Sequence, residues 1–228
     1  MHRYFVTGTD TDIGKTRVTA TIARALRDRG REPTIVKVVQ TGLAFDETGD
    51  AEYAGRLSDS PSVELARFSS ASDPWSAAIA DGVPALRAQA LASAISKLSM
   101  PIVVQGSGGL AVPLNEGETL GVVAQLAELR IVLGVGLRLG CINHALLTLA
   151  YCDQLGLAVA GAVFIDRWGT TTEAYRNDVW RALRERVPIL GLLPFSPDAK
   201  RSVTEGSQLF SNMIAFDDEL HFDADAGA

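Results

Sequence analysis

The N-terminal glycine-rich segment has the residue types and spacing that bind nucleotide phosphates. It reads Gly8-Thr9-Asp10-Thr11-Asp12-Ile13-Gly14-Lys15-Thr16 and lies between a short apolar run and an amphipathic stretch. In such a loop, backbone N–H groups surround the phosphates and the start of the next helix adds its positive end. Lys15 would reach the β- and γ-phosphates, and the Thr16 hydroxyl would bind Mg²⁺. The segment predicts a nucleoside triphosphate site, although five residues separate its glycines and Thr9 takes the usual first-glycine position.

A second ligand for the metal is expected at the end of a buried strand, where this type of site usually has an acid. The candidate strand covers residues 102–104 and is followed by Gln105-Gly106-Ser107-Gly108-Gly109. The position after the strand is therefore a glutamine. Its amide can offer a carbonyl oxygen to the metal but no negative charge.

Lys37 lies within an apolar run, Ile35-Val36-Lys37-Val38-Val39. A lone charge in such a strand is costly unless it faces an anion. The pattern by itself leaves two interpretations open: a lysine that faces phosphate, or a lysine on an edge strand that reaches solvent.

Short apolar runs alternate with amphipathic stretches along the chain, which is typical of a mostly parallel sheet in an α/β fold. We expect one P-loop NTPase-type domain over residues 1–228, with helices on both faces of the sheet. Strands are predicted at residues 4–7, 34–39, 102–104, 130–135, 159–165 and 189–192. Helices are predicted at residues 15–29, 50–58, 84–99 (with Pro84 in the first turn), 119–129, 143–155 and 172–186. The remainder of residues 40–83 is predicted to form long loops.

The composition is that of a globular protein, with 47% hydrophobic and 21% charged residues. No apolar run reaches the roughly 18–20 residues that span a membrane. The two cysteines have no metal-ligand spacing, and residues 1–5 do not resemble a secretory signal, so we expect a cytoplasmic protein. Most of the net charge of -6 lies in residues 216–228, which we interpret as a solvated acidic tail. The nearly neutral remainder gives no reason to expect a nucleic-acid partner.

Several motifs together resemble the dethiobiotin synthetase family. The segment from Tyr4 to Thr16 is similar to that family's P-loop over its whole length. Lys37-Val38-Val39-Gln40-Thr41-Gly42 resembles a second family motif, and Gln105–Gly109 resembles a third, which is normally E-G-A-G-G. Leu139-Gly140-Cys141-Ile142-Asn143-His144 and Gly191-Leu192-Leu193-Pro194 resemble two more. The matches are colinear over roughly residues 3–197.

The resemblance implies an ATP-dependent ligase that requires Mg²⁺. In the family reaction, 7,8-diaminopelargonate takes up CO₂ as a carbamate, ATP phosphorylates the carbamate, and the second amine closes the ureido ring. Phosphoryl transfer of this kind depends mainly on positioning and charge stabilisation. The resemblance also implies a homodimer, because in the family the segment that corresponds to Leu139–Asn143 comes from the partner subunit.

The resemblance assigns a role to each matching position. The catalytic residues would be Lys15, Lys37 and Thr11, and the metal ligands Thr16, Asp50 and Gln105. The substrate would be bound by Thr41, Leu139, Gly140, Cys141, Ile142 and Asn143. The nucleotide would contact Asp12, Ile13, Gly14, Lys15, Thr16, Arg17, Asp50, Gln105, Gly106, Ser107, Gly108, Asp166, Arg167, Pro194 and Phe195.

Three positions depart from the family pattern. Gln105 replaces the glutamate that coordinates Mg²⁺ and so removes one negative charge from the metal site. Asp166 stands where many members have an asparagine that reads adenine; an ionised carboxylate only accepts hydrogen bonds, so another nucleotide, such as one carrying cytosine, becomes conceivable. The loop at residues 73–78 is shorter than its family counterpart.

Two other functions stay open at this level. Gln105 is compatible with a degenerate paralogue that binds nucleotide and serves as a regulatory or partner-binding module. Retention of Lys37, Thr41 and Asn143 argues against that alternative. A partition-type ATPase would usually carry a second lysine early in the P-loop, and residues 9–13 contain none.

Overall fold

The computed structural model describes residues 2–225, and its centre is a seven-stranded sheet in which every neighbouring pair of strands is parallel. The strand order is β4-β2-β6-β1-β7-β8-β9. The strands are β1 (Arg3–Gly8), β2 (Thr34–Lys37), β4 (Ser62–Glu64), β6 (Ile102–Gln105), β7 (Arg130–Gly136), β8 (Val159–Ile165) and β9 (Ile189–Leu193). The predicted α/β class is confirmed.

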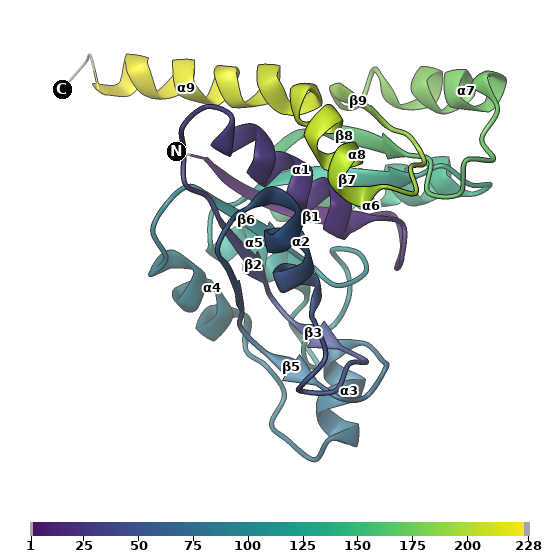
Figure 1. The fold of residues 1–228 in the computed structure, drawn as a ribbon. Helices are drawn as coiled ribbons and strands as arrows, with labels where there is room; N and C mark the ends of the chain where they lie inside the picture. The colour runs from purple at the N-terminus through teal and green to yellow at the C-terminus, as the bar shows by residue number, and fades with distance from the viewer. Residues whose placement is uncertain (1, 226–228) are drawn as a thin grey trace.

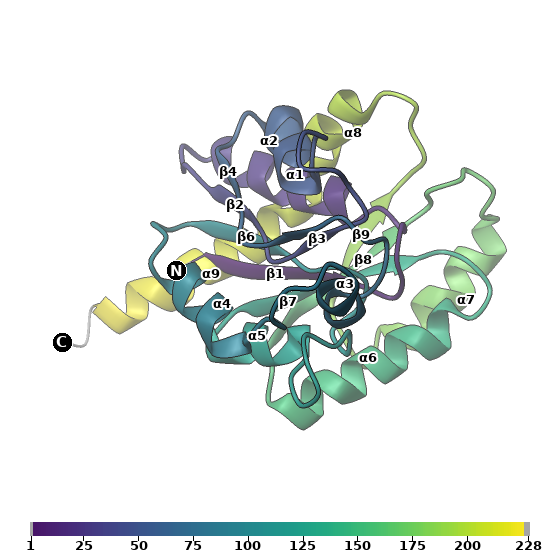
Figure 2. The same cartoon turned by 90° about the horizontal axis from the view of Figure 1, so that it is seen from below.

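Alternate residues of the strands face opposite sides of the sheet, and helices cover both sides. Tyr4 and Val6 of β1 face α1 (Lys15–Arg27), α2 (Asp50–Ser58), α8 (Ala199–Gly206) and α9 (Ser211–Asp225). Phe5 faces the opposite layer, which contains α4 (Ala88–Ser96), α5 (Leu120–Leu126), α6 (Cys141–Leu155) and α7 (Glu173–Leu183). Figure 2 shows the strands between these two layers. Both faces are buried, which explains the continuous apolar runs in the sequence.

The carboxyl ends of β1, β2 and β6 meet at one edge of the sheet. Gly8, Lys37 and Gln105 are the last residues of these three strands, and each is followed by a motif identified in the sequence. Ligands of open α/β sheets bind at this edge. The parallel arrangement therefore brings together residues that are up to 97 positions apart.

Residues 40–83 contain more regular structure than the predicted loops and single helix. A small parallel sheet pairs β3 (Gln40–Thr41) with β5 (Arg67–Phe68), and α3 (Pro74–Ala80) follows. These elements lie away from α9 in Figure 1. The Asp73 carboxylate caps α3 by accepting hydrogen bonds from the N–H groups of Trp75 and Ser76. Strands of two residues are too short to show a period of two, so the sequence pattern could not reveal β3 and β5.

Several predicted helices end earlier than expected, and two begin more than one residue from the predicted start. The helix predicted to begin at Pro84 begins at Ala88, because Arg87 has an extended backbone and the Ala88 N–H donates to the Glu118 carboxylate at 3.1 Å. The helix predicted from Asn143 begins at Cys141, directly after Gly140, whose φ of 94° is readily adopted only by glycine.

The prediction of a solvated acidic tail was wrong for Asp217. This residue of α9 is 2% exposed, accepts a hydrogen bond from the Tyr4 hydroxyl at 2.5 Å and pairs with Arg130. Its neighbour Asp218 pairs with His2 at 2.9 Å and with Arg31 at 2.8 Å. The acids of the predicted tail beyond residue 218 lie outside the residues whose side chains are described. Asp217 and Asp218 thus link α9 to residues at the amino ends of β1 and β7.

No helix within residues 2–225 is long and apolar enough to span a membrane.

Candidate active site

The phosphate-binding segment forms a loop between β1 and α1, as predicted. Gly14 precedes α1 with φ 109°, a conformation that side chains disfavour, and it has no side chain to cap the helix. The first N–H groups of α1 therefore remain available to an anion. Lys15 lies 6% exposed in the first turn, and its ammonium donates to the Asp10 carbonyl at 2.7 Å.

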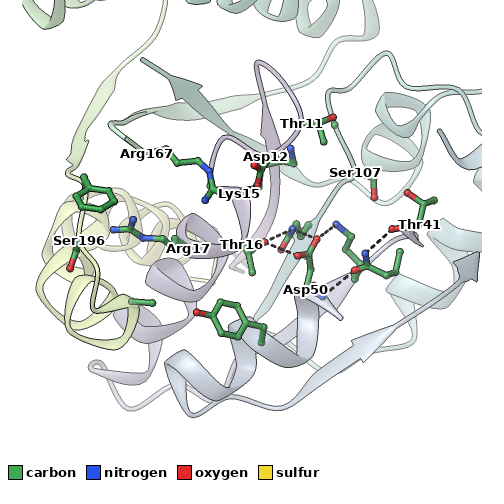
Figure 3. A pocket seen from close by; sticks show the side chains of 18 of the residues that line it. Thr11, Asp12, Lys15, Thr16, Arg17, Thr41, Asp50, Ser107, Arg167 and Ser196 are labelled. Carbon is green, nitrogen blue, oxygen red and sulfur yellow. Dashed lines mark hydrogen bonds and ion pairs between the residues drawn. The ribbon is translucent and has the colours of Figure 1, made fainter. Parts of the chain in front are cut away.

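A cavity of about 490 Å³ opens beside this loop (Figure 3). Most of the predicted catalytic, nucleotide-binding and metal-binding residues line it, together with five that sequence reasoning missed. The predicted residues are Thr11, Asp12, Gly14, Lys15, Thr16, Arg17, Lys37, Thr41, Asp50, Gln105, Ser107, Gly108, Arg167 and Phe195. The missed residues are Gln40, Tyr53, Ser196, Pro197 and Ala199. Of the other nucleotide contacts implied by the resemblance, Ile13, Gly106, Asp166 and Pro194 do not line this cavity.

The Asp50 carboxylate joins three elements at the cavity wall. It accepts hydrogen bonds from the Thr16 hydroxyl at 3.0 Å and from the Gln105 amide at 3.1 Å. The Lys37 ammonium pairs with it at 2.6 Å. These contacts connect the first residue of α2 with the ends of β2 and β6 and with the first turn of α1.

Lys37 faces an anion, and the alternative of an edge-strand lysine is excluded because β2 lies between β4 and β6. The side chain is 3% exposed, and burial lowers the pKa of its ammonium despite the adjacent Asp50. Burial alone would raise the pKa of Asp50, but the Lys37 charge and the hydrogen bonds hold it below its usual value. The 2.6 Å contact places the Lys37 ammonium directly against the Asp50 carboxylate.

Gln105 carries an unsatisfied oxygen at this wall. Its Nε2 donates to Asp50 and, at 3.2 Å, to Thr16, whereas its Oε1 is buried with no hydrogen-bond partner among the described residues. A buried polar atom without a partner is costly; turning the amide by about 180° would present this oxygen to Thr16 and Asp50, where a metal would lie. Residues 2–225 show no cluster of three or more His, Cys, Asp or Glu for a metal ion. One carboxylate, one hydroxyl and one amide oxygen nevertheless suit Mg²⁺, which usually keeps waters and phosphate oxygens as its other ligands.

The loop after β8 is held by Asp166 and Arg167. The Asp166 carboxylate is 5% exposed and accepts a hydrogen bond from the Gly169 N–H at 2.9 Å. Arg167 pairs with Asp12 of the phosphate loop at 2.8 Å. One Asp166 oxygen thus stabilises its own loop, and contact of this residue with a base stays a prediction.

A second cavity of about 490 Å³ adjoins the first. The two share Thr11, Thr41, Ser107 and Gly108, and the second is completed by Gly42, Ala71, Ser72, Asp73, Pro74 and Val112. Its wall consists of small side chains and hydroxyls, with one carboxylate at Asp73. A molecule bound in the second cavity would therefore lie beside the phosphate loop.

The segment Leu139–Asn143 lines neither cavity. It forms the start of α6, where Leu139 is 90% exposed and Cys141 is buried against the Tyr175 hydroxyl. Arg138 precedes it and pairs with Asp10 of the phosphate loop. Within one chain, these five predicted substrate contacts remain apart from Thr41.

We expect nucleotide binding to take up a proton near pH 8. Burial, followed by repulsion from Lys37, lowers the pKa of Lys15 to about 8 without nucleotide. Phosphate oxygens favour the charged ammonium and so raise this pKa, and ATP affinity should fall as the pH rises above about 8. Calorimetry at about pH 8.5 in buffers of different ionisation enthalpy measures this uptake. Lys15→Arg is the control because its guanidinium stays protonated; equal uptake in the variant, or none in the wild type, would contradict the assignment.

Comparison with known proteins finds relatives that match most of this chain. A family model described as an AAA domain matches residues 2–203. The ATP-dependent dethiobiotin synthetase BioD of Streptomyces coelicolor is 38% identical over 86% of this chain and 87% of its own length. The protein of the same name from Anaeromyxobacter sp. strain K is 36% identical over 92% of this chain and 97% of its own.

Solved structures at low sequence identity share the fold. The septum site-determining protein MinD of Pyrococcus horikoshii, complexed with Mg-ADP, aligns with a TM-score of 0.59 at 16% identity, over 97% of this chain and 98% of that one. Cobyrinic acid a,c-diamide synthase of Mycobacterium smegmatis, with a bound ATP analogue and magnesium, gives 0.58 at 19% identity over 93% of each chain. The sequence matches, which cover most of both chains, decide the family: this chain belongs to the ATP-dependent dethiobiotin synthetases.

Proposed function

We propose that this protein catalyses the Mg²⁺- and ATP-dependent conversion of 7,8-diaminopelargonate and CO₂ to dethiobiotin. The observation that carries the proposal is the pair of adjoining cavities. One holds Lys15, Lys37 and the Thr16–Asp50–Gln105 group, and the other shares Thr11 and Thr41 with it. A phosphate site and a small-molecule site in direct contact suit transfer of a phosphoryl group to a bound substrate.

The side chains of the site would act mainly by positioning and by charge. Lys15 and Lys37 would stabilise the negative charge that spreads over the transferred phosphoryl oxygens. The hydroxyls of Thr11 and Thr41 would hold the carbamate or the diamine at the boundary of the two cavities. Thr16, Asp50 and Gln105 would hold Mg²⁺, which when bound neutralises phosphate charge.

The proposal includes a homodimer whose partner subunit completes the substrate site. Supporting it, Leu139 and Leu147 are 90% and 62% exposed at and near the start of α6. The N-terminus of α6 also suits a carboxylate, because its first N–H groups point outward. Residues 139–143 line neither cavity of their own chain, and a second chain could bring its copy of this segment to Thr41. Sedimentation with and without the diamine measures this assembly.

The decisive experiment is phosphate release in the presence of bicarbonate and Mg²⁺, with and without 7,8-diaminopelargonate. ATP, CTP and GTP are compared in parallel because Asp166 stands where many family members have an asparagine that reads adenine. Diamine-dependent release together with formation of dethiobiotin is the expected result. Nucleotide binding without diamine-dependent turnover would contradict the proposal. No feature of the site or of the comparisons favours a module without ligase activity.

Gln105→Glu is expected to lower the Mg²⁺ concentration needed for half-maximal turnover by about tenfold. A second carboxylate can present a charged oxygen to Thr16 and Asp50, where the Gln105 amide now presents Nε2. The variant brings a like charge next to Asp50, so its free energy of unfolding without metal should fall by about 1 kcal/mol. Magnesium titrations of the rate and thermal unfolding measure the two effects. An unchanged magnesium dependence would show that Gln105 is not a ligand.

A further inference from the structure

The first turn of α2 is fixed by a side chain from outside the helix. Gly49 occupies the N-cap position and has no side chain that could accept a hydrogen bond. The N–H of Asp50, the first helical residue, donates instead to Gln40 Oε1 at 3.0 Å. A side chain ten positions earlier thus performs the capping role that Ser, Thr, Asp or Asn usually perform locally.

Gln40 is itself held in place by the small sheet. Its backbone N–H donates to the Ala66 carbonyl at 2.9 Å, and it lies opposite Arg67 in the β3–β5 register. Its Nε2 donates to the Thr41 carbonyl at 3.1 Å, and the side chain is 7% exposed. Both ends of the amide are therefore used, one toward Asp50 and one toward Thr41.

Arg67 and Gly49 complete the support of this turn. The Arg67 guanidinium pairs with Glu64 at 2.7 Å and donates to the carbonyls of Ala44 and Glu47, which belong to the loop that leads into α2. A Cβ on Gly49 would lie 2.6 Å from both Arg67 and Glu64. Both atoms are the ends of side chains, so a larger residue at position 49 would displace the Arg67–Glu64 ion pair.

We propose that Gln40 is a positioning residue that aims the Asp50 carboxylate at Thr16 and at the metal position. The proposal rests on the Mg²⁺–nucleotide site argued above. Gln40 acts through the Asp50 N–H: that hydrogen bond orients the first turn of α2, and the carboxylate on the same residue reaches Thr16 Oγ1 at 3.0 Å. On this interpretation, the β3–β5 sheet positions two consecutive residues, Gln40 and Thr41, at the cavity.

Calorimetry of ATP binding with Mg²⁺ and with EDTA tests the proposal. We expect Gln40→Met to reduce the gain in ATP affinity that Mg²⁺ provides by about tenfold, which corresponds to one buried hydrogen bond. The affinity in EDTA should fall less than the affinity with Mg²⁺, because the phosphate loop is untouched even though Gln40 lines the cavity. Gln40→Glu keeps an acceptor oxygen for the Asp50 N–H but loses the donation to the Thr41 carbonyl, so it should retain more of the gain than Gln40→Met. Gln89→Met, at an exposed position of α4, is the matched control.

Two further measurements separate positioning from general damage. Amide hydrogen exchange at Asp50 should be faster in Gln40→Met and near wild-type in Gln40→Glu. In an Asp50→Asn background, Gln40→Met should cause no further loss of the Mg²⁺ gain, because the group it positions is absent. Unchanged Asp50 exchange, or an equal loss in both backgrounds, would overturn the inference. A wild-type protein that gains no ATP affinity from Mg²⁺ would instead contradict the proposed function.

Discussion

Replacing Lys37 by alanine is expected to reduce diamine-dependent turnover by about 10³-fold while the fold survives. The Lys37 ammonium is held by Asp50 at 2.6 Å and by the Gly106 carbonyl at 3.3 Å, so it is already directed into the cavity before a substrate arrives. A preorganised charge in a water-excluded site stabilises the transition state without the cost of rearrangement. Alanine removes that charge and leaves the phosphate loop intact.

Initial rates at saturating ATP, diamine and bicarbonate measure the loss. Circular dichroism and thermal unfolding establish whether the Lys37→Ala variant is folded. The matched control is Lys97→Ala, which removes an exposed lysine after α4. ATP affinity should fall much less than turnover, because Lys15 and the loop N–H groups bind the ground-state phosphates. Wild-type turnover in Lys37→Ala would contradict the assignment of this residue to catalysis.

Asp50→Asn is expected to reduce the gain in ATP affinity that Mg²⁺ provides, leaving the part due to Thr16, Gln105 and the phosphate oxygens, and to destabilise the protein without ligands. Lys37 is 4% exposed at its side chain, whereas Asp50 is 36% exposed. Removing the carboxylate leaves a buried ammonium without a counter-charge, which typically costs 3–5 kcal/mol. Partial exposure of Asp50 places the expected loss of unfolding free energy at about 2 kcal/mol at neutral pH.

The loss has a defined pH dependence. Without Asp50, the pKa of Lys37 in the folded state falls further below the ordinary value of 10.5. The unfolded chain then binds a proton that the folded chain does not, and this difference disappears as the pH rises toward 10.5. Destabilisation relative to the wild type should therefore shrink at alkaline pH. Denaturant titrations between about pH 7 and pH 10 measure the trend, since both limits lie below the lysine's unfolded pKa.

A double-mutant cycle identifies the source of the effect. Combining Asp50→Asn with Lys37→Met should recover most of the lost stability, because no buried charge remains unpaired. Asp46→Asn, an exposed acid in the preceding loop, is the control for charge removal alone. A double variant as unstable as Asp50→Asn would show that the Lys37–Asp50 pair is not the cause.

The local pattern of apolar and polar residues was enough to predict the main architecture. Alternation of apolar runs with amphipathic stretches predicted a parallel sheet covered on both faces, because strands buried on two sides cannot alternate in polarity. The phosphate loop was predicted for a similar reason: its function depends on backbone groups that consecutive residues place between one strand and one helix. Lys37 was conspicuous because a charge within an apolar run demands an explanation.

The tertiary structure decided which residues act together. The order of the strands decided whether Lys37 faces an anion or solvent. Because β2 is an internal strand between β4 and β6, Lys37 is buried and faces Asp50. The Asp217 carboxylate belongs to an acidic segment that looked solvated, yet it is buried because β1 and β7 bring Tyr4 and Arg130 to it. The composition of a segment gives its net charge, but the partner of each charged side chain is known only from the packing of the folded chain.

Sequence alone therefore determined the fold class, the phosphate loop and the family of this protein, since each depends on residues that are adjacent or evenly spaced. The contact of Gln40 with Asp50, the unsatisfied Gln105 oxygen and the separation of Leu139–Asn143 from the two cavities required the folded chain. Each of these features depends on residues whose spacing in the sequence follows neither a helical nor a strand period. Their positions follow from strand register, a two-residue sheet and the loop that leads into α2, and no local propensity encodes them.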